Sequence, residues 1–389
     1  MAKNNETINI IKETLRNFEK EYIKNDLKNI DNFVNDFFVN EDDTSFIGKG
    51  LNDWHFGVEN IKSAFKIYWD DSNKLFKNIE LDIDKSIISV EGDIASVAIN
   101  GKSTFINTEN DISKNMVNCM AETLENGVSR RDLLKLSDEI SRTLYNISLG
   151  ETYICPFRAT IVMINNKNKW KIKHMNISCA LDGREIVLDD ENLDDTLKIL
   201  EIRQKDNEDI KEIKKILDIF QDGYDKRDEK LVDIYGEKLL WNDENLFIFG
   251  TDQGEDFYGF NEGKELFESD WKYWGDFNLN RENAYIYVYE NVAVVLSKAF
   301  ITFNFKEDKV CTWPKQNFDY YKKQDKSKIE LLQDVLFSIN NALNCMQDEK
   351  QMLPMKFVGV LVKKEGSWKF SHMHFSDIIE DVQEVRKSE

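Results

Sequence analysis

The stretch Leu217–Asp233 reads LDIFQDGYDKRDEKLVD and repeats Leu15–Asp31, which reads LRNFEKEYIKNDLKNID, 202 residues earlier. In both stretches apolar residues recur at steps of three and four, which is the period of an amphipathic helix. We therefore expect a long helix in each, with a break near Lys24–Asp26 and near Lys226–Asp228. The identical residues of the later stretch are Leu217, Phe220, Tyr224, Lys226, Asp228, Lys230 and Asp233.

The repeat continues along the rest of the chain. At the same offset of 202 residues, identical residues pair at Asn40/Asn242, Gly48/Gly250, Gly57/Gly259, Phe65/Phe267 and Trp69/Trp271. An offset of 198 residues then pairs Pro156/Pro354, Trp170/Trp368, Lys171/Lys369, His174/His372, Met175/Met373 and Ser178/Ser376. Self-similarity at a fixed spacing indicates duplicated structural units. We predict two copies of one domain, at 1–181 and 209–389, joined by an acidic and partly helical linker at 182–208 that has no aromatic residue.

Each copy has the same expected order of elements. After the helices and a short strand, a glycine introduces a small helix, and a hairpin follows (83–90 with 94–105, and 284–289 with 292–305). A helical insertion, at 131–147 or 329–345, separates this hairpin from two final strands. Because sequential strands joined by short turns pair with each other, the order predicts an α+β class with an antiparallel sheet and helices on one face.

The composition excludes several classes of function. The 389 residues carry a formal net charge of −20 and a sequence pI near 4.8, and so acidic a surface repels nucleic acid. The five cysteines form no C-x-x-C pair, which argues against a disulfide framework or zinc knuckle. Neither a secretion signal nor an apolar run long enough for a bilayer is present. We expect a cytoplasmic protein with no membrane partner.

Two motifs resemble the nuclear transport factor 2-like superfamily, in particular its SnoaL-like branch. The first is Gly250-Thr251-Asp252-Gln253-Gly254-Glu255-x-x-x-Gly259, and the second is Trp368-x-x-x-His372-x-His374-x-Ser376. The first copy has departed from both, with Asp53 in place of the loop Glu and Asn176 in place of the second His. The helical insertions are not part of the usual family plan.

The resemblance implies two cystatin-like cones, in each of which a curved sheet wraps a long N-terminal helix around a pocket. Enzymes of this fold (ketosteroid isomerases, polyketide cyclases and dehydratases) use an Asp or His in the cone as general base. Single-copy relatives commonly dimerise through the sheet, so we expect the two copies to form an intramolecular pseudo-dimer. Homo-oligomerisation of the chain stays open.

Strand alternation would place Trp368, Phe370, His372, His374 and Ser376 on one face, as a pocket wall. The alternative is that these side chains only satisfy buried polar groups. With the resemblance, the candidate catalytic residues are His372, His374, Asp252 and Glu255, and Tyr258 could donate to an oxyanion. The candidate ligand-binding residues are Trp241, Tyr258, Trp271, Trp274, Ser376, His174, Asn176 and Trp54, although ordinary core packing also explains the repeated Trp271.

No metal or cofactor is predicted. His372 and His374 could share an ion, but spacing assigns no third ligand, and the chain has no phosphate loop and no G-x-G-x-x-G. Three functions stay open: binding of a small hydrophobic or amphipathic molecule without turnover, acid–base catalysis of the isomerase, cyclase or dehydratase kind, and a purely structural assembly role. We favour the first and place the ligand in the second copy, which keeps both histidines and the loop Glu.

Overall fold

The computed structural model describes residues 2–50, 52–70, 76–106, 108–125, 130–148, 150–166, 169–179, 207–251, 254–304, 310, 312–324, 328–345 and 350–378. Their elements follow one order twice. In the first copy these are α1 (Ala2–Tyr22), α2 (Ile30–Phe37), β1 (Ser45–Ile47), β2 (Trp54–Phe56), α3 (Val58–Tyr68), β3 (Ile79–Leu81), β4 (Ile87–Glu91), β5 (Ile94–Ile106), α4 (Glu109–Glu125), α5 (Arg130–Ser148), β6 (Thr152–Asn166) and β7 (Lys169–Cys179).

The second copy repeats this order after residue 206. Its elements are α7 (Glu208–Lys226), α8 (Val232–Leu239), β8 (Phe247–Phe249), β9 (Asp256–Tyr258), α9 (Gly259–Tyr273), β10 (Asp276–Leu279), β11 (Tyr285–Tyr289), β12 (Val292–Asn304), α11 (Trp313–Tyr321), α12 (Lys328–Cys345), β13 (Lys350–Lys364) and β14 (Ser367–Asp377). The predicted break is present in both copies, because α1 ends at Tyr22 and α7 at Lys226. Residues 180–206, nearly all of the predicted linker, lie outside the described residues.

Each copy forms a seven-stranded sheet with the same connectivity. The strand order is β2-β1-β7-β6-β5-β3 in the first and β9-β8-β14-β13-β12-β10 in the second, with β4 and β11 added beside β5 and β12. The pairings with a printed register are antiparallel except one in each sheet, because β1 runs parallel to β7 and β8 parallel to β14. The sheets are therefore mixed rather than purely antiparallel. The predicted α+β class and the duplication are confirmed.

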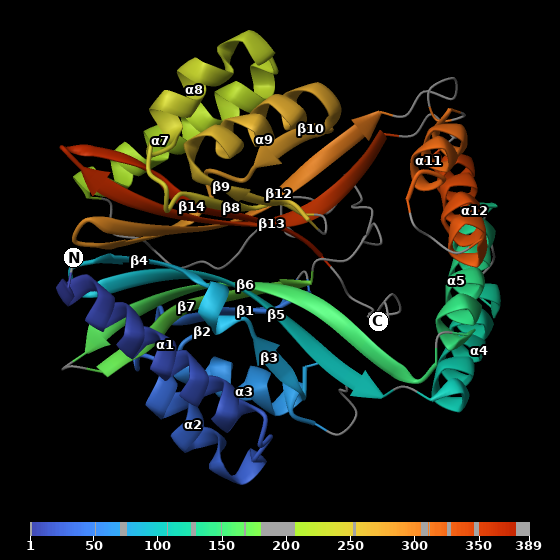
Figure 1. The fold of residues 1–389 in the computed structure, drawn as a ribbon, viewed down its shortest axis with the longest axis horizontal. Coiled ribbons are helices and arrows are strands. Elements are labelled where there is room, and N and C mark those ends of the chain that lie inside the picture. Colours follow the sequence, from blue (N-terminus) through green and yellow to red (C-terminus); the bar gives the residue numbers. More distant parts are fainter. Residues whose placement is uncertain are drawn as a thin grey trace. The chain divides into compact units, whose positions relative to one another are not determined.

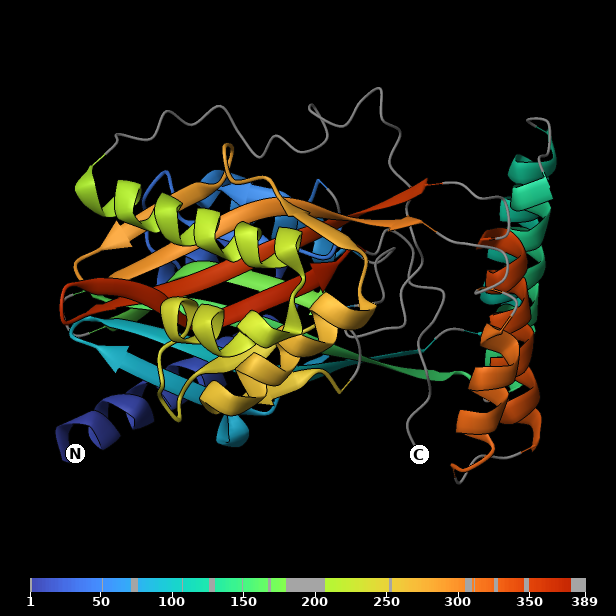
Figure 2. The same ribbon diagram turned by 90° about the horizontal axis from the view of Figure 1, so that it is seen from above.

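The long helix of each copy packs on its own sheet. Figure 1 shows α7, α8 and α9 together on one face of the second sheet, and α1, α2 and α3 together on one face of the first. Seen from above in Figure 2, α7 lies across the strands of its sheet. Phe220 of α7 is fully buried there, with ring centroids 5.5 Å from Phe357 and 6.0 Å from Phe277. Phe18 of α1 packs on Phe33 of α2 and on Phe38, which forms a bridge to Ile172 of β7.

The residues group into two compact units, of which the larger contains both sheets with α1–α3 and α7–α9. Inside this unit one hydrophobic cluster joins Ile47, Phe56, Ile94 and Val162 of the first copy to Val292, Val294, Leu296, Val358, Val360 and Val362 of the second. The smaller unit consists largely of the insertions, in which the Arg142 guanidinium of α5 lies 3.5 Å from the ring centroid of Phe337 in α12. None of the described helices is long and apolar enough to cross a membrane.

Candidate functional site

A cavity of about 170 Å³ opens between the helix and loop layer of the second copy and its last strand. We call it the second-copy cavity. Its lining includes the carboxyl groups of Glu255 and Asp270 and the aromatic rings of Trp274 and the buried Phe375. The remaining lining residues are Gly250, Thr251, Leu266, Ser269 and Tyr273. A lining that combines carboxyl groups with aromatic rings suits an amphipathic ligand.

Asp270 occupies the last turn of α9, one residue before the buried Trp271. Its carboxylate accepts a hydrogen bond of 2.6 Å from the hydroxyl of Tyr224 on α7. Burial, with a smaller contribution from the nearby Glu255 carboxylate, raises the pKa of Asp270 to about 7 against the opposing effects of the Tyr224 hydroxyl and the Arg227 guanidinium. A carboxyl group that titrates near neutral pH can donate or accept a proton, so Asp270 is the chemically distinctive group of the cavity.

Glu255 enters the cavity from the loop between β8 and β9. The loop is closed by a hydrogen bond of 2.8 Å from the Gly250 amide to the Glu255 carbonyl. A Cβ atom at Gly250 would lie 2.3 Å from Oε2 of Glu255, so only glycine leaves room for the carboxylate. Gly48 has the same role beside Asp53, where the corresponding distance is 1.9 Å. The repeated glycine of the G-T-D motif is therefore explained by the acidic residue that follows it.

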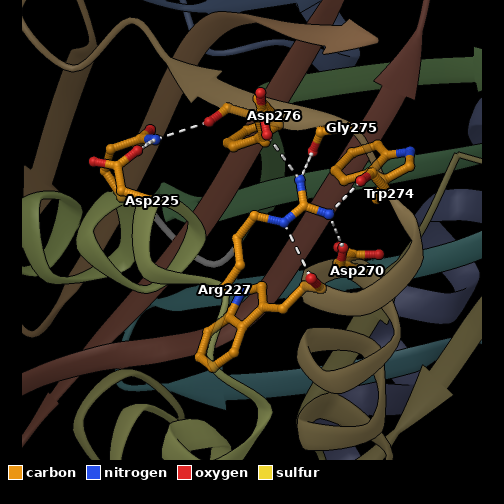
Figure 3. Close-up of polar contacts among 9 residues, drawn as sticks. Asp225, Arg227, Asp270, Trp274, Gly275 and Asp276 are labelled. Carbon is orange, nitrogen blue, oxygen red and sulfur yellow. Dashed lines mark hydrogen bonds and ion pairs between the residues drawn. The ribbon is translucent and has the colours of Figure 1, made fainter. Parts of the chain in front are cut away.

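The Arg227 side chain forms hydrogen bonds with the backbone segment that carries Trp274 (Figure 3). Its guanidinium donates to the carbonyls of Asp270 and Gly275 at 3.2 and 2.7 Å, and to that of Trp274, and it pairs with Asp276 at 3.0 Å. A cation at the C-terminal end of α9 is favoured by the helix dipole, and it adds donors to carbonyls of the last turn and of the residues that follow it. The backbone of Arg227 is left-handed, with φ of 50°, a strained conformation for a residue with a Cβ, and the side-chain bonds compensate for it.

The corresponding region of the first copy is filled by its own side chains. Tyr68 stands at the position of Asp270, and its hydroxyl donates to Asp53 at 2.5 Å. Asp53, which corresponds to Glu255, also contacts the ring of His55 at 2.6 Å. A hollow of about 280 Å³ does occur in the first copy, but it lies along α1 and the following turn and is lined by charged side chains such as Glu21 and Lys24. The two copies have thus diverged at equivalent positions.

The histidines of the terminal strand lie away from the second-copy cavity. A β-bulge at Ser371 pairs Val360 with His372 but Leu361 with Phe370, and an extra residue reverses the alternation of faces. Phe370 therefore contacts Phe220 of α7, whereas His372 points to the other face. The prediction that Trp368, Phe370, His372, His374 and Ser376 share one face is wrong. The first copy has an equivalent shift between Val162 and Met163.

His372 and His374 meet side chains of the first copy in what we call the inter-sheet network. The Phe247 carbonyl, which can only accept, lies 2.9 Å from Nδ1 of His372, so this nitrogen carries the hydrogen. Nε2 of His372 then accepts from the Thr160 hydroxyl at 2.6 Å, and Thr160 in turn accepts from Nδ1 of His374 at 2.8 Å. Nε2 of His374 accepts from Ser178 at 2.7 Å. Each ring is neutral in this arrangement.

Burial has the same consequence for the charge of these rings. It lowers the pKa of His372 to about 4 and that of His174 to about 3, and it holds the pKa of His374 well below its ordinary value. Ser376 lies 3.4 Å from the Asn176 amide, which itself lies 3.1 Å from His374. Nδ1 of His174 is 2.8 Å from the Ser45 hydroxyl. All these residues are buried, and most of their polar atoms are paired, although Nε2 of His174 and Oδ1 of Asn176 have no hydrogen-bond partner within the described residues.

The aromatic candidates are dispersed. Trp274 lines the second-copy cavity. Trp271 is buried against Tyr235 and Phe267. Trp241 donates to the Val362 carbonyl at 2.8 Å, and both it and Trp54 pack on the hydrophobic cluster that joins the copies. Tyr258 is 49% exposed. Asp252 lies outside the described residues, and of the candidate catalytic residues Glu255 is placed in the cavity.

Sequence reasoning missed Asp270, Tyr224 and Arg227 as site residues. Tyr224 was recognised as a repeated helix position, and Asp270 has Tyr68 as its counterpart, so a search for identities passed over it. A search for polar residues that replace aromatic ones between the copies would have found Asp270. Within the described residues no group of three or more His, Cys, Asp or Glu side chains is arranged to hold a metal ion.

Solved structures provide the comparison with known proteins. A nuclear transport factor 2-like superfamily protein from Salmonella enterica matches with a TM-score of 0.29 and 16% identity, over 45% of this chain and 92% of its own. A ketosteroid isomerase-like protein from Erwinia carotovora atroseptica matches with a TM-score of 0.28 and 10% identity, over 45% of this chain and 97% of its own. The chain is similar to nuclear transport factor 2-like proteins. A cystatin-like fold protein from Burkholderia xenovorans matches with a TM-score of 0.25 and 13% identity, over 44% of this chain and 90% of its own.

These likenesses concern the fold alone, because the identities are low. No family model and no curated protein matches the chain. The function must therefore be argued from the residues of the cavity.

Proposed function

We propose that the second copy binds a small amphipathic molecule in the second-copy cavity. The observation that carries the proposal is the pairing of Asp270 and Glu255 with Trp274 and Phe375 around one hollow of about 170 Å³. A cavity of roughly 150 Å³ holds a benzene ring. The ligand class is therefore a single ring or short branched chain that bears one polar group, with the ring against Trp274 and the polar group at the carboxyls.

The charge of the cavity narrows the class of ligand further. Glu255 and Asp270 together create a negative potential that disfavours a carboxylate or phosphate ligand. An amine can pair with both carboxyl groups, and its cation can also lie against the indole of Trp274. A hydroxyl or carbonyl group can instead accept a hydrogen bond from Asp270 in its protonated form. Amines, alcohols and ketones are thus the favoured ligands, and anions are disfavoured.

The test is calorimetric titration with benzylamine, benzyl alcohol and benzoate, which share one ring and differ in the polar group. We expect binding of the amine and the alcohol and none of benzoate. Trp274→Ala and Glu255→Gln should each weaken binding of the amine by about tenfold or more, as expected for the loss of a main contact. Asp53→Asn changes the matching position of the first copy and should have no effect.

Two results would contradict the proposal. One is the absence of binding by any of the three probes to the parent protein at millimolar concentration. The other is binding that neither Trp274→Ala nor Glu255→Gln alters, because the probe would then occupy another place in the chain.

The raised pKa of Asp270 favours a second candidate function, acid–base catalysis. A carboxylate in this position can remove a proton from the carbon beside a carbonyl group and return it, which exchanges or moves that proton without any other reactant. The test is deuterium incorporation from heavy water into cyclohexanone, followed by NMR. Exchange that disappears in Asp270→Asn would support catalysis, whereas equal exchange by the parent and this variant would exclude Asp270 as the base.

A further inference from the structure

A cation of the first copy contacts the loop that forms one wall of the second-copy cavity. Arg158 of β6 is buried, and its Nη1 donates to the Gly250 carbonyl at 2.9 Å. Its Nη2 pairs with the Asp256 carboxylate at 2.8 Å. One guanidinium thus binds on both sides of the loop between β8 and β9, whose described residues (250, 251 and 254–256) we call the cavity loop.

The cavity loop is the segment that delivers Glu255. Its two ends are already joined by the hydrogen bond of 2.8 Å from the Gly250 amide to the Glu255 carbonyl. Asp256 also accepts from the Asn100 amide of the first copy at 3.0 Å. Because Glu255 lies between these fixed points, the position of its carboxylate depends on contacts made by the other copy.

The equivalent residues make the reverse contact, in which a cation of the second copy binds the loop of the first. Lys356 of β13 stands where the repeat places Arg158, it is fully buried, and its Nζ donates to the carbonyl of Gly48, the counterpart of Gly250. Reciprocal contacts between the same two positions are the mark of a two-fold interface. The pair is unequal, however, because Arg has a planar fork that binds two acceptors and Lys has a single charged point. The two-point contact, made by Arg158, is received by the second copy, which has the cavity.

We propose that Arg158 is a positioning residue of the second-copy cavity, so that the two copies act as an intramolecular pseudo-dimer in which the first copy shapes the site of the second. This goes beyond the proposed function because it requires no particular ligand. It also explains how the first copy contributes although Tyr68 and Asp53 fill its own equivalent region.

The proposal has a consequence at Asp270. The groups that act on its carboxyl are Tyr224 of α7, Arg227 at the end of α7, and Glu255 of the cavity loop. If the loop loses its contacts with Arg158, Glu255 is freed to move away and water gains access to Asp270. Both changes lower the pKa of Asp270 toward its ordinary value.

The experiment compares Arg158→Met and Arg158→Lys with Lys356→Met, the matched variant of the other copy. Hydrogen exchange measures opening of the cavity loop, and carbon-detected NMR measures titration of the Asp270 carboxyl. Arg158→Met should speed exchange in the cavity loop by roughly tenfold or more, as for the loss of a charge-assisted hydrogen bond, and lower the Asp270 midpoint by about one pH unit or more. Arg158→Lys should keep one contact and show a smaller effect. Lys356→Met should act on 48–53 instead.

A folded Arg158→Met protein with unchanged loop exchange and an unchanged Asp270 titration would overturn the proposal. Should this variant not fold, Asp256→Asn removes the ion pair but keeps the backbone contact, and its cavity loop must then exchange faster than that of the parent. Neither readout involves a ligand, so failure of this inference is distinguishable from failure of the binding proposal.

Discussion

Thr160→Val tests whether the inter-sheet network stabilises the larger unit as its geometry indicates. The side chains are nearly equal in shape, so the change removes the hydroxyl and little else. Nε2 of His372 then loses its donor at 2.6 Å, whereas Nδ1 of His374 loses Thr160 at 2.8 Å but keeps the Asn176 amide at 3.1 Å. His374 is 0% exposed and His372 4%, so water cannot replace the hydroxyl at either ring.

The magnitude follows from Nε2 of His372, which is left unpaired. Leaving one buried polar group without a partner costs about 1–3 kcal/mol, and because His372 is almost fully buried the variant should lose about 2–3 kcal/mol of unfolding free energy. The assay is urea unfolding at pH 7.5, followed by tryptophan fluorescence. Thr160→Ser is the matched control, because it keeps the hydroxyl and loses only one methyl group, which costs about 1 kcal/mol. A Thr160→Val protein as stable as Thr160→Ser would refute the reasoning.

Three further predictions follow from burial and charge. The pKa values of His174 and His372 are about 3 and about 4, below the ordinary value near 6.5, so the folded state binds fewer protons than the unfolded state. The contribution of the two rings to the unfolding free energy is complete above about pH 6.5. It is lost as the pH falls toward 4, by up to about 1.4 kcal/mol per pH unit for each ring. An unfolding free energy that stays flat from pH 6.5 to 4.5 would contradict this. The pKa of Asp270 is raised, so the contribution of this carboxyl group to the unfolding free energy is lost as the pH rises toward about 7. Asp270→Asn should therefore raise the unfolding free energy at pH 8 by about 2–4 kcal/mol and change it little at pH 4. An equal effect at both pH values would argue against a raised pKa. Trp368 is 3% exposed and donates to Asp209 at 3.1 Å, so Trp368→Ala should cost about 3–5 kcal/mol in the same urea assay, and a midpoint unchanged from the parent would show that this ring is not an anchor.

The repeat was sufficient to predict the architecture. The spacing of Phe220 and Tyr224 predicted α7, and the pairing of Trp170 with Trp368 predicted the two terminal strands with their buried tryptophans. The helices α4 and α11 were not predicted. The three-residue strands β2 and β9 were also missed, because so short a segment shows no period, although the equally short β1 and β8 were predicted.

The site was harder to predict, for two physical reasons. The bulge at Ser371 adds one residue to a strand whose alternation otherwise reads as regular, so the faces of His372 and Phe370 could not be assigned from sequence. Asp270 depends on three-dimensional neighbours, since its distinctive property comes from burial and from Glu255, fifteen residues away in the chain. A pattern search has no access to either cause.

The account depends most on Asp270 as a carboxyl group that titrates near neutral pH inside the second-copy cavity. The direct measurement is a carbon-13 NMR titration of the aspartate carboxyl signals from pH 3 to 9, with the signal of Asp270 identified by its absence in Asp270→Asn. The account predicts a midpoint of about 7. A midpoint near 4, the ordinary value of an exposed aspartate, would contradict it.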